Sequence, residues 1–203
     1  LFYRGELTAA QEILEQGRSI YDPQAHRSLT LIYGQDPGVG CRSYASLATW
    51  FLGYPDQALG KSHETLSLAR ELSHPFSIGA ALQTAAWVRQ YRQEGCAVQA
   101  HAEEEIALSG EEGFALWLAV GTIQRGWALS EQGDQEQGLA QMRKGLTALN
   151  ATGAKLAQPY HLGLLAQAHG KSGQPHEGLT LLAQAFAAIE QTGERCYEAE
   201  LYR

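Results

Sequence analysis

The chain is 203 residues long and 44% hydrophobic, with a formal net charge of −7 at pH 7, and its 15 Lys and Arg are scattered rather than clustered. This pattern argues against nucleic acid and anionic membranes as partners, because both attract a concentrated basic surface. No apolar run approaches the roughly 20 residues that span a bilayer, and no signal-like segment opens the chain, so we expect a cytoplasmic protein without a membrane partner.

Helical patterns follow one another along the whole chain. We expect an N-terminal helix near 5–19, a longer connection over 21–36 and a final helix from about 195. Only Leu29–Tyr33 could pass for a strand, and a single strand has nothing to pair with, so the predicted fold class is all-α. The helices between them are expected as four pairs, at 37–52 with 55–72, 75–92 with 95–111, 114–132 with 134–151, and 158–172 with 174–191.

Glycines recur every forty residues at the expected helix ends. Glycine suits these positions because it adopts the left-handed backbone conformation without steric cost. The recurrence therefore predicts a repeat of about 40 residues. One series is Gly113, Gly153 and Gly193, and the other is Gly53, Gly133 and Gly173, with Gln93 in the remaining repeat.

The two helices of each expected pair carry different patterns. The second helices have an apolar stripe, and the first helices have a small residue at a fixed position, which would let two helix backbones approach closely. Pairs of this period bury their apolar faces by stacking on their neighbours into a solenoid. The stripes are Leu139, Met142, Leu146 and Leu149, then Leu179, Leu182, Phe186 and Ile189; the small residues are Ser46, Ala86, Gly126 and Ala166.

The repeats resemble the tetratricopeptide repeat, lengthened from its usual size. The resemblance is carried by the small residue in the first helix, the glycine seven positions later, and a second small residue five positions further on. It implies a right-handed α-solenoid of antiparallel helix pairs, with about four repeats plus flanking helices in one domain over residues 1–203. The second small residues are Ala58, Val98, Gly138 and Gly178.

Several segments also resemble one bacterial group, the C-terminal repeat region of multidomain signal-transduction ATPases that often carry an N-terminal adenylate or guanylate cyclase domain. The resemblance implies that the chain is a fragment of a larger protein, and that it acts as a regulatory arm for catalytic domains upstream. The segments are Tyr33–Val39, Leu52–Leu59, Ala69–Phe76, Gly113–Trp117, Arg125–Leu129 and Gly193–Tyr202.

Motifs for catalysis or cofactor binding fail on inspection. Gly60-Lys61-Ser62 and Gly170-Lys171-Ser172 lack the earlier glycine of a phosphate-binding loop, because Pro55 and Leu165 stand there. We expect no enzyme activity, no catalytic residue and no cofactor.

Metal binding is also not expected. His161 and His169 are two helical turns apart, too far to share a metal, and His176 would join them only by chance, so we interpret these histidines as surface or cap residues. Cys41, Cys96 and Cys196 are an odd number without a CxxC pair, so we expect buried free thiols.

A binding groove is the remaining functional expectation. The resemblance to the tetratricopeptide repeat implies that the first helix of each pair lines a concave groove. Aromatic residues are common anchors of binding surfaces. Trp87 and Trp127 share one repeat position, so they are either exposed groove anchors or plugs between helices. The preferred hypothesis is a groove for a peptide or protein domain; the alternative is a sensor that closes over a metabolite. The candidate groove residues are Trp50, Gln83, Trp87, Tyr91, Trp127, Tyr160 and Gln167.

Overall fold

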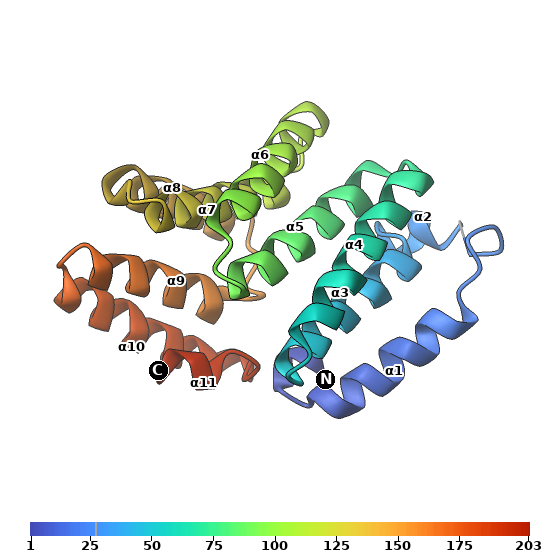
Figure 1. The fold of residues 1–203 in the computed structure, drawn as a ribbon, viewed down its shortest axis with the longest axis horizontal. Helices are drawn as coiled ribbons and strands as arrows, with labels where there is room; N and C mark the ends of the chain where they lie inside the picture. Colours follow the sequence, from blue (N-terminus) through green and yellow to red (C-terminus); the bar gives the residue numbers. More distant parts are fainter. Residues whose placement is uncertain (27) are drawn as a thin grey trace.

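The computed structural model describes residues 1–26 and 28–203, and all the regular structure in that part of the chain is helical (Figure 1). The all-α prediction is therefore confirmed. A short 3-10 turn, Phe2–Arg4, precedes eleven α-helices. They are α1 (Leu7–Ile20), α2 (Leu29–Tyr33), α3 (Pro37–Phe51), α4 (Pro55–Leu72), α5 (Pro75–Tyr91), α6 (Gly95–Glu112), α7 (Ala115–Glu131), α8 (Gln135–Ala151), α9 (Gln158–Lys171), α10 (Pro175–Thr192) and α11 (Glu198–Leu201).

The four expected helix pairs agree with α3 to α10 to within about one residue at each end. The connection after α1 differs, because the segment that could pass for a strand forms the short helix α2. That helix ends at Gly34, whose left-handed backbone (φ 72°) donates its N–H to the Thr30 carbonyl. An isolated strand would leave its backbone groups without such partners.

The turn within each helix pair uses the left-handed conformation that the glycine series predicts. Gly53, Gly133 and Gly173 have φ values of 90°, 99° and 74°. Gln93 takes the same place with φ 61°, so one repeat pays the steric cost that glycine avoids. The forty-residue recurrence of glycine therefore reflects the left-handed backbone conformation that these turns require.

The small residues of the two helices meet at a seam inside the third and fourth pairs, α7 with α8 and α9 with α10. A Cβ atom placed on Gly126 would lie 2.7 Å from the Gly138 carbonyl oxygen, and one on Gly138 would lie 2.7 Å from the Gly126 oxygen. In the last pair a Cβ on Gly178 would lie 2.9 Å from the Ala166 oxygen. Both distances are shorter than carbon–oxygen van der Waals contact, so the seam admits no larger side chain at these glycines. The predicted packing seam is confirmed for these two pairs.

Successive pairs stack so that each first helix contacts the next first helix: α3 with α5, α5 with α7, and α7 with α9. The α1 helix packs on α3, and the result is an α-solenoid. We call the side formed by the first helices the inner face.

One member of the expected apolar stripes is exposed. Leu139 on α8 is buried with Leu165 and Ala168 of α9, which belongs to the next pair. Leu179, its counterpart forty residues later on α10, is 62% exposed, because the short helix α11 lies against the other end of that stripe, where Leu201 joins Ile189. The prediction of burial was wrong for Leu179.

Candidate functional site

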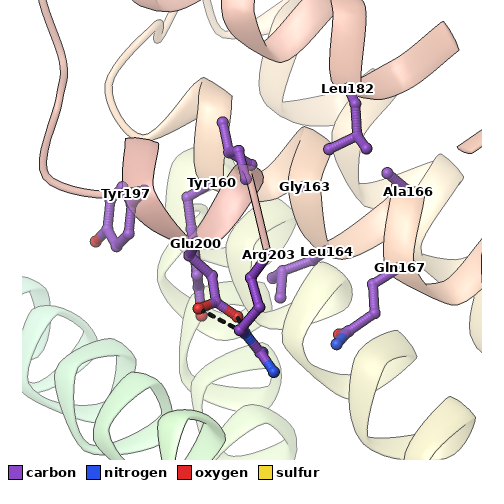
Figure 2. A pocket seen from close by; sticks show the side chains of 10 residues that line it. Tyr160, Gly163, Leu164, Ala166, Gln167, Leu182, Tyr197, Glu200 and Arg203 are labelled. Carbon is purple, nitrogen blue, oxygen red and sulfur yellow. Dashed lines mark hydrogen bonds and ion pairs between the residues drawn. The ribbon is translucent and has the colours of Figure 1, made fainter. Parts of the chain in front are cut away.

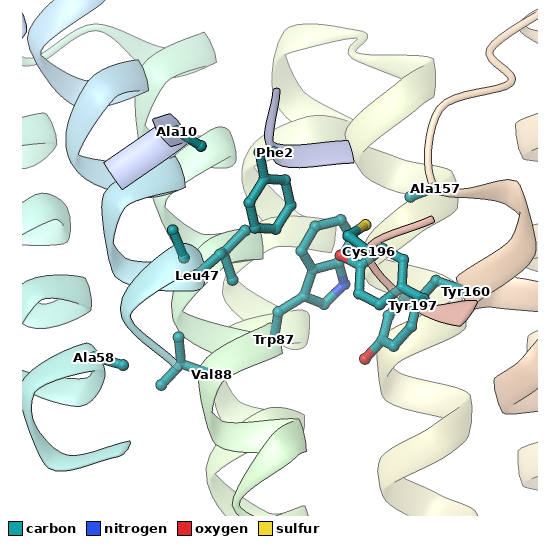
Figure 3. Packing of buried hydrophobic residues seen from close by; sticks show 11 residues of the cluster. Phe2, Ala10, Leu47, Ala58, Trp87, Val88, Ala157, Tyr160, Cys196 and Tyr197 are labelled. Atoms are coloured by element: carbon teal, nitrogen blue, oxygen red, sulfur yellow. The ribbon is translucent and has the colours of Figure 1, made fainter. Parts of the chain in front are cut away.

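The inner face is built from aromatic side chains that come from distant parts of the sequence. Tyr160 of α9 stacks on Tyr197 of the C-terminal segment with ring centroids 4.5 Å apart, and the edge of Trp87 from α5 meets Tyr160 at 5.4 Å. Phe51 of α3 lies 5.6 Å from Tyr197 and Tyr91 of α5 lies 5.4 Å from Phe51. We call these five residues, together with Phe2, the aromatic cluster; Figure 3 shows Phe2, Trp87, Tyr160 and Tyr197 converging.

The phenol groups of the cluster are hydrogen-bonded and remain protonated. The Tyr160 hydroxyl donates to Gln90 Oε1 at 2.5 Å, and the Tyr91 hydroxyl donates to the Tyr197 hydroxyl at 3.3 Å. Burial raises the pKa of Tyr91, Tyr160 and Tyr197 well above the ordinary value, because a phenolate would lose its hydration. These groups therefore serve as neutral donors and acceptors.

The two chain ends meet beside this cluster. The backbone N–H groups of Arg195 and Cys196 donate to the Tyr3 carbonyl at 2.7 and 3.2 Å. One residue earlier, Glu194 Oε2 accepts from the Ala157 N–H at 3.0 Å, which ties the C-terminal segment to the start of α9. The ends thus close the inner face between α3 and α9.

The seven candidate groove residues differ in how far they are exposed to solvent. Trp87 and Trp127 are 2% and 1% exposed, so of the two alternatives the structure agrees with residues that fill the space between helices and not with exposed groove anchors. Each indole is covered because the next pairs and the C-terminal segment close over it: Trp87 against Tyr160 and Tyr197, and Trp127 in a cluster with Leu165 and Ala168. Tyr160 is also buried; Trp50, Gln83 and Tyr91 are half-buried, and Gln167 is exposed.

Two small pockets remain on the inner face. The first, of about 290 Å³, is bounded by α9, α10 and α11, and includes Gly163, Leu182 and Leu201 (Figure 2). The second, of about 180 Å³, lies between Trp50 and Tyr91 on one side and Leu164 and Gln167 on the other. The Trp50 and Tyr91 rings lie against each other, with centroids 5.5 Å apart and planes inclined by 31°.

Histidines and cysteines form no metal centre in the described part of the chain, where three or more possible ligands nowhere come together. His161 and His169 are buried, so the prediction of surface or cap positions was wrong for both. His169 is held by Gln174 and Arg143, whereas burial alone lowers the pKa of His161 to about 4. All three cysteines have free thiols, but only Cys196 is buried as expected, whereas Cys41 is half-buried and Cys96 is exposed.

Sequence reasoning missed Phe2, Tyr3 and Tyr197. Tyr197 stands eighty residues, or two repeat lengths, after Trp117. An aromatic residue at the same repeat position was therefore a weak signal. Phe2 and Tyr3 precede the repeats and gave no signal. A further missed residue is Glu105 of α6, whose carboxyl is wholly buried against Gly121.

Comparisons with known proteins agree with this architecture. A tetratricopeptide-repeat family model matches residues 119–144, which cover most of α7 and the first part of α8. The apo form of RapI superposes with a TM-score of 0.63 at 13% identity, covering 98% of this chain and 70% of RapI. A putative kinesin light chain of Podosopora anserina with TPR-like repeats superposes with a TM-score of 0.53 at 13% identity, covering 95% of this chain and 98% of that one. The chain is therefore similar in fold to TPR-like solenoids.

An uncharacterized protein of Rhizobium meliloti is 24% identical over 209 residues. The match covers 100% of this chain and only 20% of the relative. The chain therefore spans about a fifth of the length of the curated relative it matches. Within the described residues, no helix is both long and apolar enough to cross a membrane.

Proposed function

We propose that this chain is a non-catalytic binding arm of a multidomain cytoplasmic signalling ATPase or nucleotide cyclase, and that its inner face binds a peptide or another domain of the same polypeptide. The observation that carries the proposal is the aromatic inner face, whose half-buried edge at Trp50 and Tyr91 adjoins the exposed Gln167. Aromatic side chains beside adaptable amides are typical of protein-binding surfaces. The much longer relative supports a role within a larger protein.

The size of the inner-face pockets favours a peptide over a metabolite. Sites for drug-sized ligands enclose roughly 300 to 1,000 Å³. The two pockets here have volumes of about 290 and 180 Å³. The buried side chain of Tyr197 lines both of them. The alternative function, a sensor that closes over a small molecule, would need the C-terminal segment to move away from this cluster.

A binding assay against the upstream ATPase and cyclase domains of the full polypeptide tests the proposal. Trp50→Ala should weaken the complex at least tenfold by calorimetry, because it removes an aromatic contact at the open edge of the inner face. Tyr54→Ala is the matched control, since Tyr54 is an exposed aromatic at the start of α4 and lines neither inner-face pocket. No binding by the wild type, or equal loss in both variants, would contradict the proposed function.

A further inference from the structure

The smaller inner-face pocket has walls of distinct chemistry. Trp50 and Tyr91 supply aromatic surface, and Leu164 supplies an aliphatic wall. Glu200 and Arg203 of the C-terminal segment also line it, and they pair with each other, with Arg203 Nε donating to Glu200 Oε1 at 2.9 Å (Figure 2). The pocket therefore joins an apolar floor to one carboxylate whose charge is already balanced.

A buried amide in this pocket has an unused donor. Gln90 is 2% exposed and lines the pocket, and its Oε1 is occupied by the Tyr160 hydroxyl. For its Nε2, no acceptor lies within hydrogen-bond distance among the residues that the structure describes. The same holds for Nε1 of Trp127, another buried residue of the pocket wall. Buried donors without partners cost free energy, so an acceptor that reaches them through a small shift of the wall side chains would be bound favourably.

The complementary group must accept from Gln90 and donate to Glu200. A primary carboxamide does both, because its carbonyl oxygen is an acceptor and its NH₂ is a donor. A carboxylate offers acceptors alone and would face Glu200 in a chain of net charge −7. An ammonium group would leave the Gln90 donor unsatisfied. The volume of about 180 Å³ suits one side chain rather than a whole metabolite.

We propose that this pocket binds the side-chain carboxamide of a Gln or Asn residue in a peptide partner. The carbonyl oxygen accepts from Gln90 Nε2, the amide NH₂ donates to Glu200, and the side-chain methylenes lie against Trp50 and Tyr91. This inference rests on the proposed function, because it names the group by which the inner face recognises its peptide.

The experiment uses a chain labelled with ¹⁵N in glutamine and tryptophan side chains and titrated with N-acetyl-L-glutamine N-methylamide. We expect saturable shifts of the Gln90 side-chain NH₂ and the Trp127 indole N–H. The glutamate and norleucine analogues should bind at least tenfold more weakly, since one carries a charge and the other lacks the amide. Saturation by propionamide but not by the peptide-like probe would overturn the assignment to a peptide. Equal binding of the three analogues, or no shift at Gln90, would overturn the inference altogether.

Two variants of the C-terminal segment provide a matched pair. Glu200→Gln should lower the preference for the glutamine probe over the glutamate probe at least tenfold, because the anionic acceptor is removed. Glu198→Gln neutralises a carboxylate that is paired with Arg195 and lies outside the pocket, so it should leave the preference unchanged. An unchanged preference in Glu200→Gln would contradict the assigned role of Glu200.

A third variant, Gln90→Met, keeps the side-chain length and removes the donor. If it keeps the wild-type unfolding midpoint and still binds the glutamine probe equally, the inference is wrong. If Trp50→Ala weakens binding of the upstream domains but Gln90→Met and Glu200→Gln leave their affinity unchanged, the carboxamide inference alone fails. If the glutamine probe shifts Gln90 while the upstream domains do not bind, the proposed function alone fails.

Discussion

The seam inside each helix pair and the aromatic cluster of the inner face are two kinds of core. The seam joins residues twelve positions apart, Gly126 with Gly138, and the arrangement recurs forty residues later with Ala166 and Gly178. The aromatic cluster joins Phe2 to Tyr197 across the whole chain and occurs once. The seam is dictated by local spacing, whereas the cluster depends on how the pairs stack.

The two regions also differ in what they leave unsatisfied. At the seams of α7 with α8 and of α9 with α10, backbone approaches backbone and the small residues that meet carry no polar side-chain group. At the inner face, buried donors of Gln90 and Trp87 have no acceptor among the described residues. We infer that the seam maintains the fold and that the inner face retains capacity for a ligand.

The largest effect is expected at the seam. Gly126→Ala should destabilise the fold by more than ~4 kcal/mol or prevent folding, because its Cβ would lie 2.7 Å from backbone atoms of α8 that cannot move independently. Gly60→Ala on α4 is the control, since a Cβ there meets nothing within 4 Å. It should raise stability by about 0.5 to 1 kcal/mol in urea unfolding. Similar results for both glycines would mean that the seam is looser than described.

Truncating a buried tryptophan of the inner face should cost more unfolding free energy than truncating a half-buried one. Trp87→Ala is expected to cost ~3 to 5 kcal/mol of unfolding free energy, because it opens a cavity beside Tyr160 and Tyr197. Trp50→Ala, at the half-buried edge, should cost about 2 kcal/mol or less. Equal costs in urea unfolding would erase the distinction between the closed part of the inner face and its open edge.

Acid should weaken the inner face through His161. Burial lowers the pKa of His161 from 6.5 to about 4, so the unfolded chain takes up this proton first as pH falls. The neutral form contributes its full stability above pH 6.5, and roughly 3 kcal/mol is lost between pH 6.5 and 4. His161→Gln should remove that part of the pH dependence of unfolding. An unchanged pH profile in the variant would show that His161 is hydrated in the folded protein.

An effect of opposite sign in pH is expected from Glu105 between α6 and α7. Burial raises the pKa of its carboxyl well above the ordinary 4.5, and neither oxygen has a hydrogen-bond partner among the described residues. The folded protein therefore retains this proton, and the stability it gives is full below pH 4.5 and declines as pH rises toward the folded-state pKa. Glu105→Gln should be more stable than wild type at pH 8, where thermal unfolding can compare them. A less stable variant at pH 8 would indicate that the carboxylate has a cationic partner.

The sequence predicted the seam and the helix boundaries because both follow from neighbours in the chain. Gly133 and its equivalents are required by local backbone conformation, and Gln93 was recognised as the exception from spacing alone. Trp50, Trp87, Tyr91 and Tyr160 pack in one cluster, and their role in binding a partner stays a prediction.

The degree of closure was not predictable. Whether Trp87 is covered depends on Tyr197, more than a hundred residues away, and on the rotation between successive pairs. Leu179 was misassigned for the same reason, because the stripe pattern gives no information about which neighbour covers it. The unpartnered amide of Gln90 follows from its contact with Tyr160, which no local pattern encodes.

Acrylamide quenching of a Trp50→Phe variant tests the central claim, that the inner face is closed over its aromatic cluster, most directly. The remaining indoles, at Trp87, Trp117 and Trp127, are all buried, so their fluorescence should be quenched several-fold less than that of free tryptophan. Quenching close to that of free tryptophan, in a variant with the wild-type unfolding midpoint, would show an open groove and contradict the closed inner face.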